Sequence, residues 1–369
     1  MNVPILDLGR VRRRIDPELQ ERWRRVLDET SFILGPEVRE FEKAFASYLE
    51  VEACVGLGNG TDALILALRA LGMKPGDEVI VPAFSFFATA EAVALLGGKV
   101  VFADVDPETL NLDPGDAEAR VTERTVGIIG VHLYGRPFDV DAMLALCERR
   151  GLWLLEDAAQ AHGARWKGRR VGGFGQLAAW SFYPTKNLGC FGDGGAVTSN
   201  DAALAQKVFS YANHGQTVRY THHEIGTNSR LDSLQAAVLN CRLALLDEDN
   251  ARRGEIACRY HGAFNGVGDL RLIPDAPEVR TVYHQFTVRT SRRDELMAHL
   301  KERGIASAVH YPSPLHLQPA MANLVEVREG DLPVSTAAAK EVLCLPVFPE
   351  LTNDEVAAVG EAVREFFGA

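Results

Sequence analysis

One lysine in a glycine-rich loop is the residue of this chain best suited to covalent chemistry. Lys186 lies within Trp180–Gly195, just after an apolar run that predicts the end of a strand. A lysine amine becomes a nucleophile toward carbonyl groups when partial burial lowers its pKa, and it can then hold an aldehyde cofactor as a Schiff base. The glycines that follow allow backbone amides to approach a bound anion. Taken alone, a lysine in a glycine-rich loop is usually a solvated surface lysine.

An acidic pair follows an earlier apolar run. Gly151–Leu155 predicts a short buried strand, and Glu156 and Asp157 come directly after it. Carboxylates at the carboxyl end of a strand in an open α/β sheet point into the ligand crevice. A carboxylate against a pyridine nitrogen keeps the ring protonated and makes it an electron sink, as pyridoxal phosphate chemistry requires. Asp157 is the candidate for this contact; the alternative is that both carboxylates cap a following helix.

A third segment predicts a phosphate site. Ala53–Leu68 has the pattern of a strand, a glycine turn and the start of a helix, where free amides bind phosphate. Gly58–Ala63 also fits the loose dinucleotide pattern G-x-G-x-x-A. A dinucleotide site needs an acidic residue at the end of the next strand, whereas Glu78 begins that strand and Pro82 ends it. A single phosphate therefore suits the segment better.

Together these segments resemble the DegT/DnrJ/EryC1/StrS family of pyridoxal-phosphate-dependent sugar aminotransferases, and the resemblance extends over nearly the whole chain. It implies an α/β fold of the fold-type I, aspartate aminotransferase-like class, with a large domain built on a mostly parallel sheet and a smaller C-terminal α/β domain. The motifs that carry the resemblance are Gly58–Asp62, Val81–Phe86, His132–Gly135, Glu156–Gly163, Ser181–Gly189, Gly226–Ala237 and Val309–Pro312.

The resemblance also implies the role of individual residues around pyridoxal 5′-phosphate. Lys186 would carry the cofactor, Asp157 would contact its pyridine nitrogen, and Gln160 would lie near its phenolic oxygen. The further cofactor contacts that it implies are Phe86 stacked on the ring and, at the phosphate, the amides of Thr61 and Asp62, the Ser181 hydroxyl and the partner subunit's Asn228. Arg230, His310 and Tyr311 resemble positions that contact the nucleotide sugar or the donor carboxylate. The site would thus be shared across a homodimer, with no metal.

Several of these residues also have simpler explanations. Phe86 lies in an aromatic run at a strand end and could be core packing. Asn228 and Arg230 could be a turn residue and a charge at a helix start. His310 could be an exposed residue where a strand of the small domain runs into a proline-rich loop.

Length and pattern predict how the chain is divided. With 369 residues and 47% hydrophobic residues, the chain exceeds the usual single-core size. We expect a large cofactor domain over residues 1–246 and a small domain over 247–369. Apolar strands alternate with amphipathic helices from about residue 53 to 200, which favours a mostly parallel sheet covered on both faces. The segments expected to be strands are 78–82, 100–103, 126–131 and 152–155, and Glu37–Leu49 is expected to be an amphipathic helix.

Charge and cysteine content indicate the class of protein. A net charge of −11 argues against non-specific nucleic-acid binding. Arg219, His222, His223 and Arg230 cluster in sequence and could form a local basic site for a diphosphate, or only an exposed charged loop. The six cysteines form no C-x-x-C pair, which is typical of reduced thiols. The absence of a signal-like N-terminus and of a long apolar run predicts a cytoplasmic protein without membrane spans.

We therefore expect amino transfer from glutamate or glutamine to a keto group of a nucleotide-linked sugar, in amino-sugar and polysaccharide biosynthesis. His214–Asp232 and Pro314–Pro319 resemble the branch that acts on UDP-linked 3-keto sugars, such as a 2-acetamido-3-keto uronate. The alternatives are a 4-keto or dTDP-linked acceptor, a pyridoxal-phosphate-dependent sugar dehydratase, and a non-catalytic regulator that binds the cofactor. In the resemblance, sugar 3-dehydratases have histidine where this chain has Lys186, which favours amino transfer.

Overall fold

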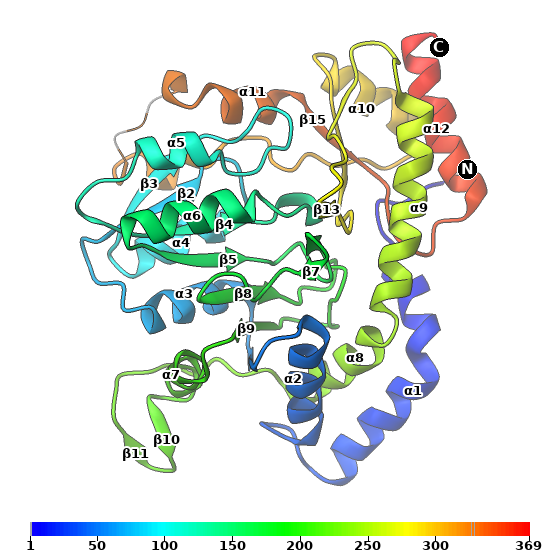
Figure 1. The fold of residues 1–369 in the computed structure, drawn as a ribbon. Coiled ribbons are helices and arrows are strands. Elements are labelled where there is room, and N and C mark those ends of the chain that lie inside the picture. The colour runs from blue at the N-terminus through cyan, green and yellow to red at the C-terminus, as the bar shows by residue number, and fades with distance from the viewer. Residues whose placement is uncertain (1, 326, 328) are drawn as a thin grey trace.

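A seven-stranded sheet is the centre of the structure, a computed structural model that describes residues 2–325, 327 and 329–369 (Figure 1). Its strand order is β1-β9-β8-β5-β4-β2-β3. All pairs from β3 to β8 are parallel, whereas β9 is antiparallel to both of its neighbours. The strands are β1 (Ala53–Leu57), β2 (Glu78–Pro82), β3 (Lys99–Ala103), β4 (Thr125–Val131), β5 (Trp153–Asp157), β8 (Leu177–Ser181) and β9 (Gly195–Ser199). The predicted mostly parallel α/β sheet is confirmed.

Alternating side chains of the strands enter two different cores. In β2, Val79 and Val81 pack into one core and Ile80 into another. In β8, Ala179 faces the first core, whereas Trp180 faces a third one on the opposite side. This period of two is expected for strands covered on both faces. The helices that cover the sheet are α2 (Pro36–Leu49), α3 (Gly60–Ala70), α4 (Ala88–Leu95), α5 (Pro114–Ala119), α6 (Val140–Arg150), α7 (Ala202–Ala212) and α8 (Ser233–Leu243).

Helix α2 supports the strand that leads to the lysine loop. Val38, Phe41 and Phe45 are buried, as their helical spacing predicts. The Phe45 ring lies 5.1 Å from Trp180 and 5.6 Å from Phe182, both edge to face. An aromatic cluster therefore fixes the position of β8 and of the backbone that leaves it.

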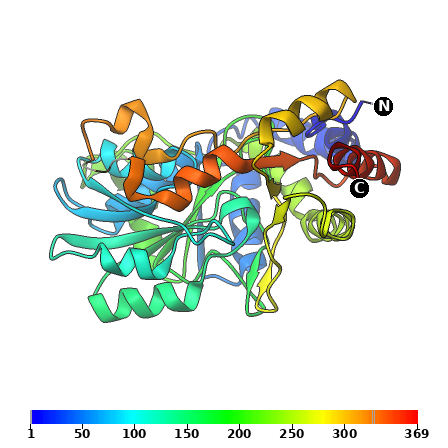
Figure 2. The ribbon, with the colours of Figure 1, turned by 90° about the horizontal axis from the view of Figure 1, so that it is seen from above.

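A second group of elements packs beside the large sheet. It contains the strands β12 (Arg271–Leu272), β14 (Phe286–Arg289) and β15 (Val342–Leu345), and the helices α9 (Leu246–Phe264), α10 (Arg293–Glu302), α11 (Pro333–Glu341) and α12 (Asn353–Phe367). Val3 pairs with Ile305 and enters the same apolar core, so the N-terminal residues lie beside this region (Figure 2). From there α1 (Leu8–Asp28) leads to α2. The division at residue 246 stays a prediction.

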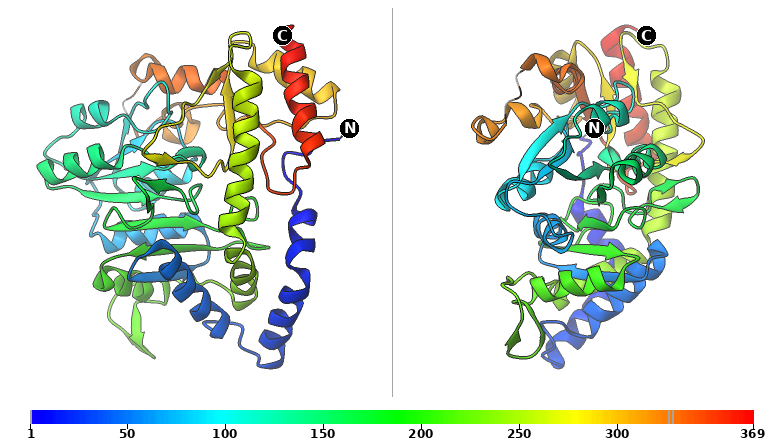
Figure 3. Two further views of the ribbon diagram at one scale, coloured as in Figure 1. Left: turned by 45° about the vertical axis from the view of Figure 1, so that its right-hand side comes forward. Right: turned by 60° about the vertical axis from the view of Figure 1, so that its left-hand side comes forward.

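Two small sheets complete the described chain. β6 (Arg165–Trp166), β7 (Arg169–Arg170) and β13 (Val279–Arg280) form one of them. β10 (Gln216–Val218) and β11 (Thr221–His222) form a hairpin at the end of the molecule opposite α12 (Figures 1 and 3). Within the described residues, we find no helix that is long and apolar enough to cross a membrane.

Replacing Phe45 by Ala is expected to destabilise the protein by about 3–5 kcal/mol, because the change removes a fully buried ring and leaves a cavity. Urea unfolding of the cofactor-free protein, followed by circular dichroism, measures this free energy. Leu95→Ala is the control, since Leu95 is 63% exposed and its removal opens no cavity. Equal unfolding midpoints for both variants would contradict the supporting role of the aromatic cluster.

Candidate active site

A cavity of about 510 Å³ lies at the carboxyl ends of the parallel strands. Parallel strands end at one edge of a sheet, so loops that are far apart in sequence meet there. Of the predicted site residues, Thr61, Phe86, Asp157, Gln160, Ser181, Lys186, His310 and Tyr311 line this cavity. Asp62, Asn228 and Arg230 are not among its lining residues. The roles predicted for individual residues stay predictions.

Lys186 follows β8 in a loop that the rest of the chain holds firmly. Its backbone amide donates to the carbonyl of Tyr183 at 2.9 Å. The buried Arg242 guanidinium donates to the carbonyls of Asn187, at 3.1 Å, and Gly189, at 2.5 Å. Burial lowers the pKa of Lys186 to about 8, although the charge of Asp157 acts in the opposite direction. The neutral amine, the form that attacks a carbonyl, is therefore far more populated near neutral pH than in an ordinary lysine.

Asp157 ends β5 and is buried on the floor of the cavity. Thr89 donates its hydroxyl to Oδ2 at 2.8 Å, and the amide of Ala159 donates to Oδ1 at 3.2 Å. Burial raises the pKa of Asp157, while these hydrogen bonds and the charge of Lys186 favour the ionised form. A cationic ring nitrogen in the cavity would supply a full counter-charge.

Glu156 has a different environment from its neighbour. It accepts hydrogen bonds from the amides of Gly172, Phe174 and Gly175 at 2.7–2.9 Å, and lies 3.1 Å from Nε2 of His132. Burial opposes its ionisation, but the bonds from His132 and the amides outweigh burial and lower the pKa of Glu156. The chain turns after Asp157 and forms no helix there, so the helix-capping alternative is wrong for both carboxylates.

The start of α3 opens on the cavity through Asn59, Gly60 and Thr61. Among the described residues, the amides of Gly60 and Thr61 have no hydrogen-bond acceptor, as expected for the first turn of a helix. A Cβ at Gly60 would lie 2.6 Å from Cβ of Ser181, so glycine permits the close approach of α3 to β8. The two amides and the Ser181 hydroxyl form a cradle that suits a phosphate group.

The predicted phosphate contact of Asp62 is occupied by other groups of the chain. Its amide donates to Oδ1 of Asn59 at 2.8 Å, which caps the helix. Its carboxylate accepts from the Ser229 hydroxyl at 2.6 Å. Asn228 is exposed and pairs with Asn213, and Arg230 donates to the side chain of Asn213 at 3.3 Å. These residues therefore lie beside the cavity without entering it.

Another part of the cavity wall comes from segments that are far apart in the sequence. Gln160 accepts from the amide of Tyr134 at 2.7 Å and donates to the Tyr311 hydroxyl at 3.0 Å. Burial raises the pKa of Tyr311, so its hydroxyl stays protonated, and burial lowers the pKa of His310. Phe86 is 57% exposed at the mouth of the cavity, 6.1 Å from the Tyr311 ring. Its ring is available for stacking, unlike that of the buried Phe84.

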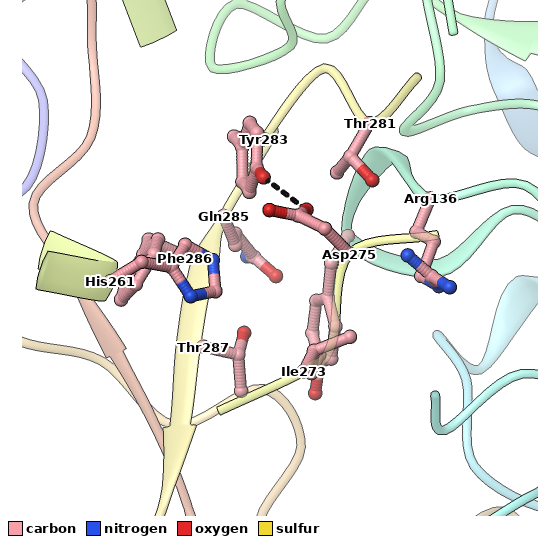
Figure 4. A pocket seen from close by; sticks show the side chains of 10 residues that line it. Arg136, His261, Ile273, Asp275, Thr281, Tyr283, Gln285, Phe286 and Thr287 are labelled. Atoms are coloured by element: carbon pink, nitrogen blue, oxygen red, sulfur yellow. Dashed lines mark hydrogen bonds between the residues drawn. The ribbon is translucent and has the colours of Figure 1, made fainter. Parts of the chain in front are cut away.

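Another cavity, behind Gln285, is too small for a cofactor. Its volume is about 20 Å³, roughly the space that one water needs (Figure 4). Arg136 and Tyr283 line it, and the Tyr283 hydroxyl donates to Asp275 at 2.8 Å. The larger cavity around Lys186 is therefore the candidate active site.

The model of the DegT/DnrJ/EryC1/StrS aminotransferase family matches residues 13–364. The chain belongs to this family. Similar relatives include a pleiotropic regulatory protein of Geobacillus stearothermophilus, 47% identical over 100% of this chain and 99% of the relative. A dTDP-3-amino-3,4,6-trideoxy-α-D-glucose transaminase of Streptomyces venezuelae is 47% identical, over 99% and 96%. A UDP-2-acetamido-2-deoxy-3-oxo-D-glucuronate aminotransferase of Pseudomonas aeruginosa is 43% identical, over 98% and 99%.

Solved structures agree with this assignment. The crystal structure of S. venezuelae DesV has a TM-score of 0.98 and 47% identity, covering 100% of this chain and 99% of that one. The Bacillus subtilis NtdA structure, with bound cofactor PMP, has a TM-score of 0.93 and 31% identity, covering 100% and 86%. The predictions of the aspartate aminotransferase-like fold, of a sugar aminotransferase and of pyridoxal 5′-phosphate as cofactor are confirmed. A dinucleotide enzyme is thereby excluded.

The site residues present fit this cofactor. The buried amine of Lys186 suits its aldehyde, the Asp157 carboxylate suits its ring nitrogen, and the amides at the start of α3 suit its phosphate. Cys190, which lies close to Lys186 in sequence, is a poor nucleophile, because burial raises the pKa of its thiol to about 12.

Sequence reasoning missed three groups around this site. Thr89 is fully buried and holds Asp157, and His284 and Gln285 line the cavity from the C-terminal half. The sequence did contain a signal that Thr89 lies near the site. It comes in the first turn after the Phe84–Phe87 run, and that run follows a strand of the same sheet. His284 and Gln285 had no comparable signal, because they come just before a strand of a different sheet.

Replacing Thr89 by Val is expected to weaken binding of pyridoxal phosphate about 10- to 100-fold, the range for losing a hydrogen bond to a charged group. Without that bond the pKa of Asp157 rises further, and its protonated form no longer attracts a cationic ring. Quenching of protein fluorescence on titration with the cofactor measures the Kd. Thr89→Ser keeps the hydroxyl and should bind nearly as the wild type does; a Val variant with unchanged affinity would disprove the role of this bond.

Proposed function

We propose that this enzyme transfers the amino group of glutamate or glutamine to the 3-keto group of a UDP-linked sugar, such as a 2-acetamido-3-keto uronate. One observation supports amino transfer: Lys186, whose pKa is lowered, and Asp157 line the same large cavity. The branch pattern in His214–Asp232 and Pro314–Pro319 supports the acceptor. The names of the P. aeruginosa and S. venezuelae relatives both specify position 3 of a nucleotide-linked sugar.

Bound pyridoxal phosphate supplies an electron sink, which makes the α-hydrogen of an amino acid acidic. Asp157, held by Thr89, would keep its negative charge against the ring nitrogen. With the cofactor and a donor amino acid bound, the Lys186 amine would be the group that accepts and delivers the proton lost from the donor α-carbon, and it would do the reverse for the acceptor sugar. Gln160 and Tyr311, joined by a hydrogen bond of 3.0 Å, would hold the cofactor ring from the side of its phenolic oxygen. The donor leaves as a 2-oxo acid.

The buried amine favours transfer over the alternatives. A sugar dehydratase of this fold or a regulator that only binds the cofactor would not need a lysine able to move protons, yet Lys186 is buried and its pKa is lowered. The name of the G. stearothermophilus relative is the reason to keep a regulatory role as the second candidate. A dTDP-linked or 4-keto acceptor uses the same catalytic groups, and only direct comparison of substrates separates these cases.

We also propose that the working form is a homodimer. Val218, Tyr220 and Ile225, on and beside the β10–β11 hairpin, are 64%, 78% and 87% exposed (Figure 1). Asn228 follows the hairpin and is exposed, outside the cavity of its own chain. Contact of this apolar segment with a second copy would cover it, and would let Asn228 reach the phosphate in the other cavity. We place such an enzyme in the cytoplasm.

An assay with glutamate and UDP-2-acetamido-3-keto-glucuronate is expected to give the 3-amino sugar, detected by mass spectrometry. The Lys186→Ala variant should give no multiple turnover, because no other described group in the cavity combines an amine with a lowered pKa. A dTDP-linked 3-keto sugar and a UDP-linked 4-keto sugar are the comparison substrates. Faster turnover of either would overturn the proposed acceptor, and multiple turnover by the Ala variant would overturn the mechanism.

Mixing two inactive variants tests the shared site. Lys186→Ala and Asn228→Ala subunits should each have low activity, and a refolded mixture should recover activity, because a mixed dimer contains one cavity with both residues intact. Light scattering should give the mass of two chains. A monomeric mass, or a mixture no more active than its components, would refute the dimer with shared sites.

A further inference from the structure

A side pocket of about 210 Å³ adjoins the cofactor cavity. The two spaces share Thr185, His284, Gln285 and His310, so the side pocket begins next to the lysine loop. Its far wall includes Leu6 from the N-terminal segment. The space is more than ten times the roughly 10–15 Å³ that one buried water needs.

Arg253, on α9, is the charged residue of this side pocket. It is 3% exposed, and no described acidic residue lines the space. Its Nη1 donates to the carbonyls of Tyr283, at 3.2 Å, and Val347, at 2.5 Å. Its Nε is buried and has no hydrogen-bond partner. The structure thus holds the guanidinium in place by neutral oxygens and leaves part of its donor capacity unused.

The carboxylates nearest to Arg253 are engaged elsewhere. Asp249 and Glu350 act on its charge from a distance, but both pair with Arg14, at 2.6 and 2.9 Å. Burial lowers the pKa of Arg253 to about 10, so the group remains a cation at neutral pH. Burying a cation without its own counter-ion is costly, which indicates that an anion completes the site.

We propose that the side pocket binds a carboxylate of the amino donor, with Arg253 as the residue that recognises it. This inference rests on the proposed amino transfer and adds where the donor is held. Thr185 and His310 line both this pocket and the cofactor cavity, which Lys186, the residue that must reach the donor α-carbon, also lines. A nucleotide sugar is too large for this space, whereas the short chain of glutamate fits between apolar walls such as Leu6, Leu345 and Val347.

Glutarate is the probe, because it carries the two carboxylates of glutamate but no amine and therefore cannot react. Calorimetric titration of the enzyme loaded with pyridoxal phosphate should give about 10- to 100-fold weaker glutarate binding for Arg253→Met than for the wild type. Arg253→Lys keeps the charge and should fall between them. In the donor half-reaction, Arg253→Met should raise the half-saturating glutamate concentration more than it lowers the limiting rate.

Arg252→Met is the matched control. Arg252 neighbours Arg253 on α9 and also donates to a carbonyl of the C-terminal region, that of Leu351 at 3.0 Å, but it lines neither the side pocket nor the cofactor cavity. Glutarate binding by this variant should equal that of the wild type. Ala308→Leu provides a second test that leaves Arg253 intact, because Ala308 lines only the side pocket of these two spaces and the larger side chain would fill it. It should weaken glutarate binding.

Unchanged glutarate affinity in folded Arg253→Met and Ala308→Leu proteins would overturn the proposal, and so would the absence of glutarate binding by the wild type. Equal losses in Arg252→Met and Arg253→Met would also overturn it, since they would trace the effect to packing of α9. A failure of the proposed acceptor gives a different result: glutarate would still bind through Arg253, while no keto sugar would be aminated.

Discussion

The burial of an amine beside a carboxylate, away from water, is the constraint on which the rest of this structure depends. Lys186 and Asp157 come from adjacent parallel strands that end at one edge of the sheet. Desolvation moves both groups toward their neutral forms, and their mutual attraction opposes this shift. The lysine can therefore lose its proton near neutral pH, while the carboxylate needs further support to stay ionised. Thr89 provides that support through the hydrogen bond from its hydroxyl.

Much of the surrounding structure keeps these two groups from moving. Arg242 donates to the carbonyls of Lys186, Asn187 and Gly189 in the lysine loop. The aromatic cluster around Phe45 packs under β8. Glu156 accepts hydrogen bonds from the amides of Gly172, Phe174 and Gly175 next to β5. Its buried carboxylate therefore fixes the conformation of a loop. Adjacent carboxylates in one sequence motif thus have separate tasks, which their hydrogen-bond partners distinguish.

The sequence was sufficient for features that depend on local pattern. The strand before Asp157, the strand before Lys186 and helix α2 follow from hydrophobic periodicity, and the phosphate cradle follows from glycines before an apolar helix. Thr89, His284 and Arg253 depend instead on distances between segments far apart in the chain, which no local pattern encodes. Asp62 shows a further limit: the sequence put it at the helix start, but only coordinates show that Asn59 takes its amide. The helix-capping explanation of Glu156 and Asp157 failed because the chain turns at residue 158 instead of continuing as a helix.

The distribution of charge connects the site with its substrates. The chain carries a net charge of −11, yet Lys186, Arg253 and the first turn of α3 place positive groups in and beside the site, where Asp157 and Asp193 are the acidic lining residues. Cofactor phosphate, donor carboxylates and a sugar diphosphate are all anions, so the negative exterior would repel them. Salt screens this repulsion at distances beyond about 10 Å. Selection must then occur at short range, through shaped pockets and oriented donors and not through long-range attraction. Arg253 fits that principle, because a buried guanidinium fixed by two carbonyls is already oriented before any anion arrives.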